Sequence, residues 1–255
     1  MYQTSILRKV REQRLLHDVT LELTYRCNLD CFYCYNDRAK PGKPLSLDQY
    51  ETLLNDLAGM QTMFLMLTGG EPMVHPHFFD IGRMARELGF VVRVRTNGHS
   101  LSRRQVERLK NESQPYMVEV SLHGATAETH DRQTRVEGSF DRLVKNLANV
   151  NKAGLRCSAV STPTAWNEHQ VEEMFALCDS LDVPLRFQGP VAPRDDGDIT
   201  PLQIQPQQET WNRITEILAQ RREPPPVVDD SCDSKADADA HPEPEERAMC
   251  GVGVA

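Results

Sequence analysis

The chain has 255 residues, with 37 acidic against 29 basic side chains and a formal net charge of −8. A chain of this length can bury one substantial core, so we expect one barrel-like domain with an appendage. The acidic balance argues against a nucleic-acid partner, and the sequence contains no apolar run long enough to cross a membrane. Arg103, Arg104 and Arg108 lie in a helical stretch and are expected to form a solvated helix face.

Residues 1–18 form an N-terminal segment that is charged and lacks the apolar region and cleavage site of a secretory signal. The chain has seven cysteines, an odd number, and three of them lie too close together for a simple disulfide framework. We therefore expect a reducing, cytoplasmic location.

The first predicted strand, Val19–Thr24, runs directly into the run Cys27-x3-Cys31-x2-Cys34. Three thiolates are one ligand short of a closed structural zinc site, whereas an iron–sulfur cube held by three cysteines leaves one iron open to a small molecule. The alternative is a zinc site whose fourth ligand comes from elsewhere; the candidates are His75, His77 and His123.

Strand-like and helix-like segments then alternate, which is typical of an α/β fold with a parallel sheet. Ser46 is expected to cap the helix that follows it. Six strand–helix units are too few for the closed eight-stranded barrel, so we predict an open, partial (β/α)6 barrel over residues 19–222. Further strands are expected at Met63–Leu67, Phe90–Arg95, Tyr116–Ser121, Leu155–Ser161 and Leu185–Gln188, and helices at Leu47–Leu57, Phe78–Leu88, Ser102–Lys110, Ser139–Ala153, Glu168–Leu181 and Gln207–Arg221.

The second predicted strand ends in Gly69-Gly70-Glu71-Pro72. Two glycines let a backbone approach a ligand closely, and Glu71 can anchor an ammonium group or hold the loop. On its own, a Gly-Gly pair is more often a tight turn.

The third and fourth strands also end in polar motifs, Thr96-Asn97-Gly98 and Ser121-Leu122-His123-Gly124. Asn97 can hydrogen-bond a ribose or an amino acid, although Asn-Gly is also a common turn pair. His123 can be satisfied by structural hydrogen bonds or can take part in catalysis.

A charged segment, His130–Phe140, follows these strand ends and contains Arg135. The planar guanidinium of Arg135 can pair with a carboxylate. The alternative is a surface arginine before a helix that Ser139 caps. Cys157 and Cys178 fall in a predicted strand and helix and are expected to be buried small hydrophobic residues.

Residues 223–255 are acidic and proline-rich and are expected to form a flexible linker. They contain Cys232 and Cys250, which cannot by themselves build a complete further cluster, because four ligands are usual.

Taken together, these motifs resemble those of the radical S-adenosylmethionine (SAM) enzymes over Val19–Gln188. The resemblance implies the open barrel fold and a [4Fe-4S] cluster whose open iron chelates the amino and carboxylate groups of SAM. It implies that Cys27, Cys31 and Cys34 bind the cluster, and that Tyr33, Gly69, Gly70, Glu71, Asn97, Ser121 and Arg135 contact SAM.

The same resemblance implies that one electron splits SAM into methionine and a 5′-deoxyadenosyl radical, which abstracts a hydrogen atom from a substrate. It also implies a reductant such as flavodoxin or ferredoxin; it assigns no catalytic side chain.

The Pro193–Gly197 loop and the Cys250–Gly253 run resemble the SPASM/twitch-type enzymes that modify peptides or proteins, with their extension truncated at Ala255. The alternatives are an enzyme of cofactor or haem biosynthesis, and a truncated, inactive core that only binds a metal or a partner.

Overall fold

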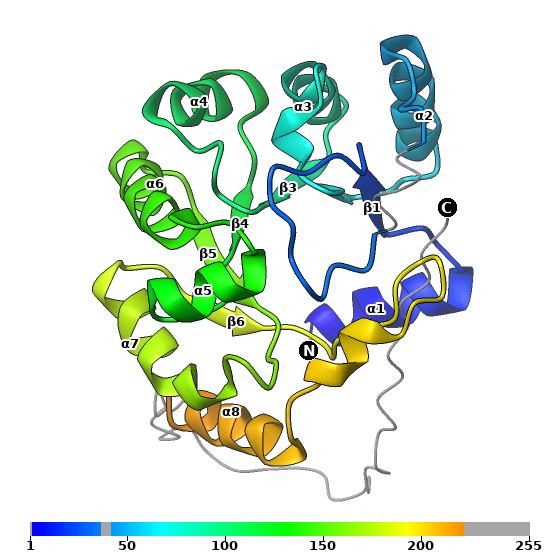
Figure 1. Ribbon diagram of the computed structural model, residues 1–255. Helices are drawn as coiled ribbons and strands as arrows, with labels where there is room; N and C mark the ends of the chain where they lie inside the picture. The colour runs from blue at the N-terminus through cyan, green and yellow to red at the C-terminus, as the bar shows by residue number, and fades with distance from the viewer. Residues whose placement is uncertain (1, 37–41, 222–255) are drawn as a thin grey trace, which may run out of the picture.

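The computed structural model describes residues 2–36 and 42–221 and contains one six-stranded parallel sheet (Figure 1). The strands follow one another in chain order across the sheet, so β1 and β6 form its two edges and the barrel is open. This confirms the predicted α/β architecture. The strands are β1 (Asp18–Glu22), β2 (Phe64–Thr68), β3 (Val91–Thr96), β4 (Met117–Ser121), β5 (Cys157–Ser161) and β6 (Leu185–Phe187).

Helices cover the outer face of the sheet and follow the strands in an arc in Figure 1. Ser46 caps α2 as expected: its hydroxyl accepts the Gln49 N–H, and the Gln49 side-chain oxygen accepts the Ser46 N–H to complete a capping box. The α-helices are α1 (Tyr2–Gln13), α2 (Leu47–Gly59), α3 (Phe78–Glu87), α4 (Arg103–Arg108), α5 (Ala127–Thr134), α6 (Ser139–Ala153), α7 (Val171–Ser180) and α8 (Gln208–Arg221). Short 3₁₀ turns lie at η1 (Pro72–Val74), η3 (Glu168–Gln170) and η4 (Thr200–Ile204), and a π-helical turn at η2 (Leu109–Ser113).

The two faces of the sheet differ in character. Val92 and Val94 of β3 are buried in the hydrophobic core beneath the helices. Side chains alternate along a strand, so Arg93 and Arg95, which alternate with these valines, point to the opposite, inner face. At β3 the sheet therefore presents apolar side chains to the helices and charged side chains to the barrel interior.

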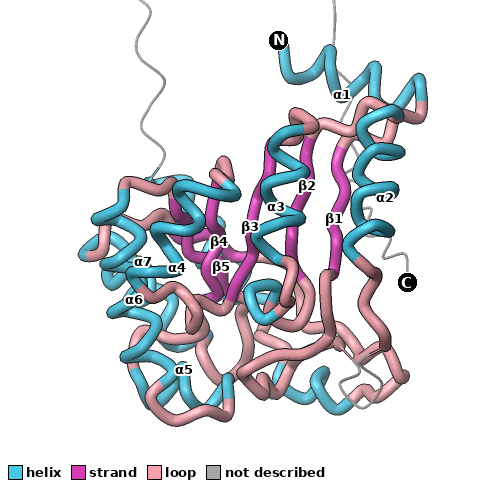
Figure 2. Tube along the Cα trace, turned by 90° about the horizontal axis from the view of Figure 1, so that it is seen from above, coloured by secondary structure: helices cyan, strands magenta, loops and turns pink. Residues whose placement is uncertain are grey.

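The segments that follow the strands gather at one end of the sheet, while α1 lies at the opposite end (Figure 2). This is the arrangement expected when parallel strands all run the same way. The sequence pattern predicted neither α1 nor α5. Ser139 was the predicted cap of α6, but Gly138 occupies the cap position, and the carboxylate of Asp131 accepts from the Gly138 and Phe140 backbones and from the Ser139 hydroxyl.

Within the described ranges, no helix is both long enough and apolar enough to cross a membrane. The predicted linker and its cysteines, Cys232 and Cys250, lie outside the described residues.

Candidate functional site

The three motif cysteines, Cys27, Cys31 and Cys34, lie on an irregular segment directly after β1. We call this segment, Thr24–Asn36, the cysteine loop. All three cysteines are half-buried, and the loop runs inside the arc of helices at the end of the sheet where the strands finish (Figures 1 and 2). The loop has almost no regular structure, so its shape depends on the segments that contact it.

The Gly69-Gly70 pair packs against the base of the cysteine loop. The Gly70 N–H donates to the carbonyl of Thr24 at 2.6 Å, and the Glu71 N–H donates to the carbonyl of Arg26 at 2.9 Å. A Cβ on Gly70 would lie 2.5 Å from the Arg26 oxygen, and one on Gly69, at φ 136°, would lie 2.4 Å from the Thr24 oxygen. The two glycines therefore allow their own backbone to contact the backbone of the cysteine loop, which goes beyond the role of a simple tight turn.

Glu71 is fully buried and its carboxylate ties neighbouring loops together. It accepts hydrogen bonds from the Thr96 hydroxyl at 2.8 Å, the Asn97 N–H at 2.8 Å and the Met73 N–H at 3.1 Å. Burial raises the pKa of Glu71 above its usual value, and these three hydrogen bonds oppose that rise. Of the two roles considered from sequence, the contacts of Glu71 match that of holding the loop.

Asn97, after β3, connects the strand end to the first motif cysteine. Its Nδ2 donates to Oδ1 of Asn28 at 2.7 Å and lies 3.6 Å from Sγ of Cys27. The Leu29 N–H also points to this sulfur at 3.4 Å. N–H groups directed at a cysteine sulfur are typical of the groups that surround a metal-bound thiolate.

The end of α5 holds the middle of the cysteine loop. The carbonyls of Gln133 and Thr134 accept from the backbone N–H groups of Phe32 and Asp30, each at 3.0 Å. Arg135 then adopts a left-handed conformation with φ 56°, which directs its exposed side chain back to the loop. Its guanidinium lies 3.7 Å from the Asp30 carboxylate and 4.9 Å from the centre of the Phe32 ring.

Tyr33 and His123 meet inside the barrel mouth. The Tyr33 hydroxyl lies 2.8 Å from Nδ1 and 3.0 Å from Nε2 of His123. The His130 ring stacks on the His123 ring, and its Nδ1 accepts the His123 backbone N–H at 3.1 Å. Burial lowers the pKa of His123 well below its ordinary value and that of His130 to about 3, so both rings are neutral.

Ser121 occupies the last position of β4 and is half-buried. It is two residues past Glu119 and shares the inner face of the sheet with it. The structure thus brings Ser121 to the mouth of the barrel together with the other residues singled out from sequence.

A further segment that holds the cysteine loop was not expected from sequence. The Arg194 guanidinium donates to the carbonyl of Phe32 at 2.9 Å, and the Asp195 N–H donates to the carbonyl of Tyr35 at 2.8 Å. Trp166 also packs on Phe32, with ring centres 4.7 Å apart. No local pattern reveals these contacts, because they join positions more than 130 residues apart in the chain.

Cysteine thiolates are the usual ligands of iron–sulfur clusters. The structure places three half-buried cysteines on one segment and directs two N–H groups at the sulfur of Cys27. Among residues 2–36 and 42–221, no three His, Cys, Asp or Glu side chains converge into a ready-made metal site. His75, a candidate fourth zinc ligand, accepts the His77 N–H through its Nδ1 at 3.2 Å. The third candidate, His123, faces the Tyr33 hydroxyl.

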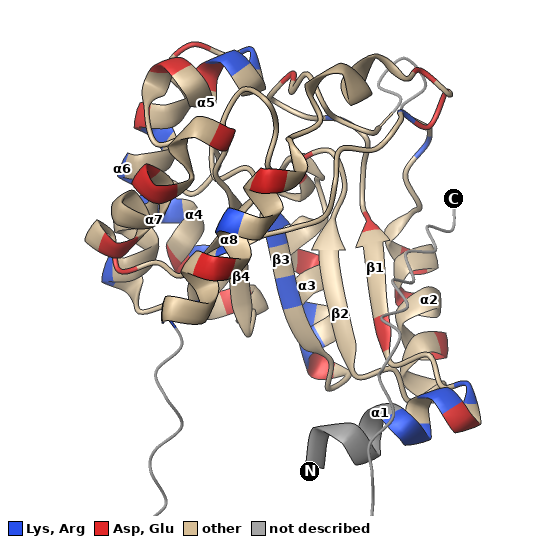
Figure 3. Cartoon of the chain, turned by 90° about the horizontal axis from the view of Figure 1, so that it is seen from below, with Lys and Arg blue, Asp and Glu red and all other residues tan. Residues whose placement is uncertain are grey.

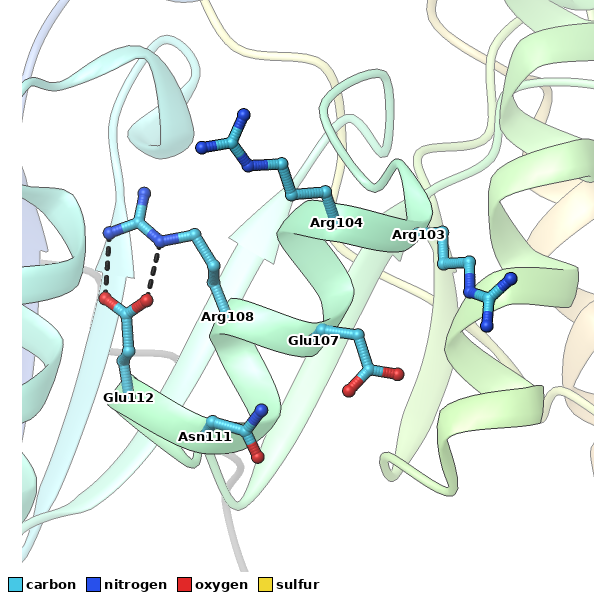
Figure 4. A pocket seen from close by; sticks show the side chains of 6 residues that line it. All are labelled: Arg103, Arg104, Glu107, Arg108, Asn111 and Glu112. Carbon is cyan, nitrogen blue, oxygen red and sulfur yellow. Dashed lines mark hydrogen bonds and ion pairs between the residues drawn. The ribbon is translucent and has the colours of Figure 1, made fainter.

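A large surface depression lies away from this site, over α4 and η2 (Figure 4). It has a volume of about 570 Å³ and is lined by charged and amide side chains that include Arg103 and Arg104. Arg108 and Glu112 pair across one helical turn at 2.6 Å. This face matches the predicted solvated helix surface, and its lining includes none of the residues predicted for the site.

Comparison with known proteins gives a family match over the residues that build this site. A family model described as "Radical SAM superfamily" matches residues 21–178, more than half of the chain. Mycofactocin maturase MftC of Mycobacterium ulcerans is 36% identical over 172 residues, which cover 66% of this chain and 46% of that protein. AdoMet-dependent heme synthase of Methanosarcina barkeri is 30% identical over 165 residues, covering 64% of this chain and 47% of that protein.

Solved structures with this fold include SuiB of Streptococcus suis bound to S-adenosylmethionine. It superposes with a TM-score of 0.66 at 16% identity, over 84% of this chain and 51% of SuiB. The anSMEcpe structure with bound AdoMet and Kp18Cys peptide gives a TM-score of 0.64 at 14% identity, over 80% of this chain and 59% of that chain. The chain spans about half the length of the curated relatives it matches.

Proposed function

The chain belongs to the radical SAM superfamily, and we propose that it uses a [4Fe-4S] cluster and S-adenosylmethionine to start a radical reaction on a peptide or protein. The observation that carries this proposal is the convergence of four segments on the cysteine loop: the Gly69–Gly70 turn, Asn97, the end of α5, and Arg194 with Asp195. When bound, the two groups supply a one-electron cleavage of the sulfonium bond and a 5′-deoxyadenosyl radical that abstracts hydrogen.

In this proposal the three motif cysteines hold the cluster. The side chain of Asn97 and the Leu29 N–H, both directed at the sulfur of Cys27, stabilise its thiolate. Arg135, at the edge of the loop, pairs with the SAM carboxylate through its planar fork.

Tyr33 lines the position for the adenine, and Ser121 lies at the end of β4 for a polar contact with SAM. Gly69 and Gly70 act through the backbone, by fixing the base of the cysteine loop, and the Glu71 carboxylate holds the segment after β3 through Thr96 and Asn97. We assign no side chain the role of a general acid or base.

A peptide or protein substrate is supported by the maturase among the relatives at 36% identity. It is also supported by the fold shared with SuiB, which has been solved bound to precursor peptide SuiA. A tetrapyrrole is the second candidate, because AdoMet-dependent heme synthase is similar to this chain over nearly the same share of residues.

The proposal is tested by reconstituting the full chain with iron and sulfide without oxygen, then adding dithionite and SAM. We expect a brown protein with iron and sulfide in equal amounts, and release of 5′-deoxyadenosine. A Cys34→Ala variant is the control and should release none. Iron-loaded wild-type protein that releases no 5′-deoxyadenosine, or a protein that takes up zinc in place of iron and sulfide, would contradict the proposal.

A further inference from the structure

The side-chain amide of Asn97 has two chemically different ends, of which only Nδ2 can donate a hydrogen bond. In the structure Nδ2 faces the cysteine loop: it donates to Oδ1 of Asn28 at 2.7 Å and lies 3.6 Å from Sγ of Cys27. If the amide were turned over about its Cβ–Cγ bond, Oδ1 would take this place and Cys27 would lose a donor. The direction of one amide group therefore decides whether Asn97 can stabilise the sulfur.

The residues that flank Asn97 determine this direction. Oδ1 of Asn97 accepts the N–H of His99 at 3.0 Å, a contact with the backbone two residues ahead that asparagine often makes in turns. The backbone N–H of Asn97 donates to Glu71 at 2.8 Å. With the backbone and Oδ1 both held, Nδ2 is left facing Cys27 and Asn28.

The charged residues of β3 are engaged elsewhere. Arg93 and Arg95, which are the basic positions along β3 in Figure 3, form ion pairs with Glu119 of β4. Asn97 follows directly after the strand, and its Oδ1 is held by a neutral backbone group. The direction of its amide therefore depends on where the N–H of His99 points.

Asn146 of α6 determines where this N–H points. Its Nδ2 donates to the carbonyl of Gly98 at 2.8 Å and to that of His99 at 3.2 Å. The Gly98 carbonyl and the His99 N–H belong to the same peptide unit, which is planar and trans, so they point in opposite directions. By holding the carbonyl toward α6, Asn146 turns the N–H toward Oδ1 of Asn97.

Close packing keeps this peptide against α6. Gly98 has a φ of 79°, and a Cβ on it would lie 2.6 Å from Cδ1 of Leu143 and 2.8 Å from Cγ1 of Val120. Leu143 lies on the same helix as Asn146, close to one turn before it. Asn146 is only 6% exposed, so water cannot readily replace the hydrogen bonds of its side chain when they are lost.

The chemistry of the cysteine loop gives this orientation a consequence. Hydrogen bonds to the cysteine sulfurs are among the features that set the reduction potential of an iron–sulfur cluster. Such a bond stabilises the more negative, reduced state more than the oxidised state, because hydrogen bonds to charged groups are stronger. A donor at Cys27 therefore makes a bound cluster easier to reduce, while the cysteine loop itself is held by the backbone contacts of other segments.

We propose that Asn146 is a positioning residue: through the Gly98–His99 peptide it keeps the donor end of the Asn97 amide on Cys27, and so raises the reduction potential of the cluster. The effect on the potential rests on the proposed function, which supplies the cluster. The contacts from Asn146 to Asn97 are present without it.

The test is a redox titration of the full chain after anaerobic reconstitution with iron and sulfide, without SAM, followed by electron paramagnetic resonance of the reduced cluster. Asn146→Ala should bind as much iron as the wild type, but about two- to tenfold less of its cluster should be reduced at a fixed potential. Asn97→Ala removes the donor itself and should shift the titration in the same direction, by at least as much. Asn146→Leu, which fills a similar volume without a donor, should behave as Asn146→Ala does and separates the lost hydrogen bonds from a cavity.

A double variant distinguishes positioning from a general structural role. In the Asn97→Ala background, Asn146→Ala should leave the titration unchanged, because the donor on which it acts is already absent. A residue that affected the cluster only by loosening the fold would shift the titration again. The matched control is Asn151→Ala: Asn151 also lies on α6 and donates its side-chain amide to a backbone carbonyl, but to that of Leu181 after α7. This variant should titrate as the wild type does.

The contacts of Asn146 can also be measured without the cluster. Before reconstitution, the backbone N–H of His99 should exchange with solvent faster in Asn146→Ala than in the wild type, and at the wild-type rate in Asn151→Ala. An unchanged titration in Asn146→Ala, loss of its iron binding, or an additive shift in the double variant would overturn the proposal. If the exchange of His99 responds as expected but the wild type never binds a cluster, the proposed function fails while the positioning by Asn146 stands.

Discussion

Replacing Gly70 by alanine tests whether the close approach of two backbones fixes the cysteine loop. The added Cβ would lie 2.5 Å from the Arg26 oxygen, 2.6 Å from the Tyr25 oxygen and 2.8 Å from the Arg26 carbonyl carbon. All three are backbone atoms, so no side chain can rotate away. Gly70 does not have the positive φ that Gly69 has, so the effect isolates steric contact from backbone strain.

The expected cost follows from the contacts that must shift. Overpacking of this kind costs about 1–3 kcal/mol. The two hydrogen bonds from Gly70 and Glu71 to the loop are lengthened or lost, at about 1 kcal/mol each. A total of roughly 3–5 kcal/mol is large against a typical stability of 5–15 kcal/mol. Either the cysteine loop detaches locally or the barrel loses much of its stability.

Two measurements distinguish these outcomes: the free energy of unfolding in denaturant, and the iron bound after anaerobic reconstitution. The control is Gly59→Ala at the end of α2, where a Cβ meets nothing within 4 Å and φ is not positive. That variant should retain full iron content and wild-type or slightly higher stability. A Gly70→Ala protein that matches the wild type in both measurements would refute the steric argument.

Three further predictions concern other parts of the site. Cys34→Ala should abolish iron binding, while Cys157→Ala should retain it, because burial raises the pKa of Cys157 to about 12 and keeps it a neutral thiol. Metal analysis that finds equal iron content in the two variants would contradict this. Arg135→Gln should weaken SAM binding about 10- to 100-fold in equilibrium dialysis, with unchanged iron content, since it removes one charge-assisted contact; unchanged affinity would exclude the carboxylate role. The pKa of His130 is about 3 in the folded state, below its unfolded value, so the unfolded state binds more protons as pH falls below about 6.5. Stability should then decrease by up to about 1.4 kcal/mol per pH unit between pH 6 and pH 4, and His130→Asn should show a shallower slope in urea titrations at each pH.

The sequence predicted the six strands and most of the outer helices because their hydrophobic patterns are strong. β2 is an uninterrupted apolar run, and α6 carries apolar residues at helical spacing. It did not predict α5, because that helix is polar and four of its eight residues are buried: Thr129, His130, Gln133 and Thr134. Hydrophobic periodicity carries no signal where a buried helix face makes hydrogen bonds in place of apolar contacts.

The site residues were identified as separate motifs, but their mutual contacts were not predictable. Two roles for Glu71 were compatible with the sequence, and the choice between them depends on Thr96 and Asn97, which lie one βα unit further along the chain. The contact of Arg194 with the cysteine loop joins segments 162 residues apart. Neither relation leaves a local pattern, because each depends on how the whole sheet brings strand ends together.

The way the cysteine loop is held indicates which substitutions matter most. Three separate segments, at Gly70, at the end of α5 and at Asp195, donate or accept through their backbones at Thr24, Arg26, Phe32 and Tyr35, among other loop positions. A side-chain truncation cannot remove a backbone hydrogen bond, so changing a single contact such as Asn97 leaves the loop supported on its other sides. A substitution that forces two backbones apart breaks several contacts together. The steric sites at the base of the loop should therefore affect cluster binding more than the polar side chains around its rim.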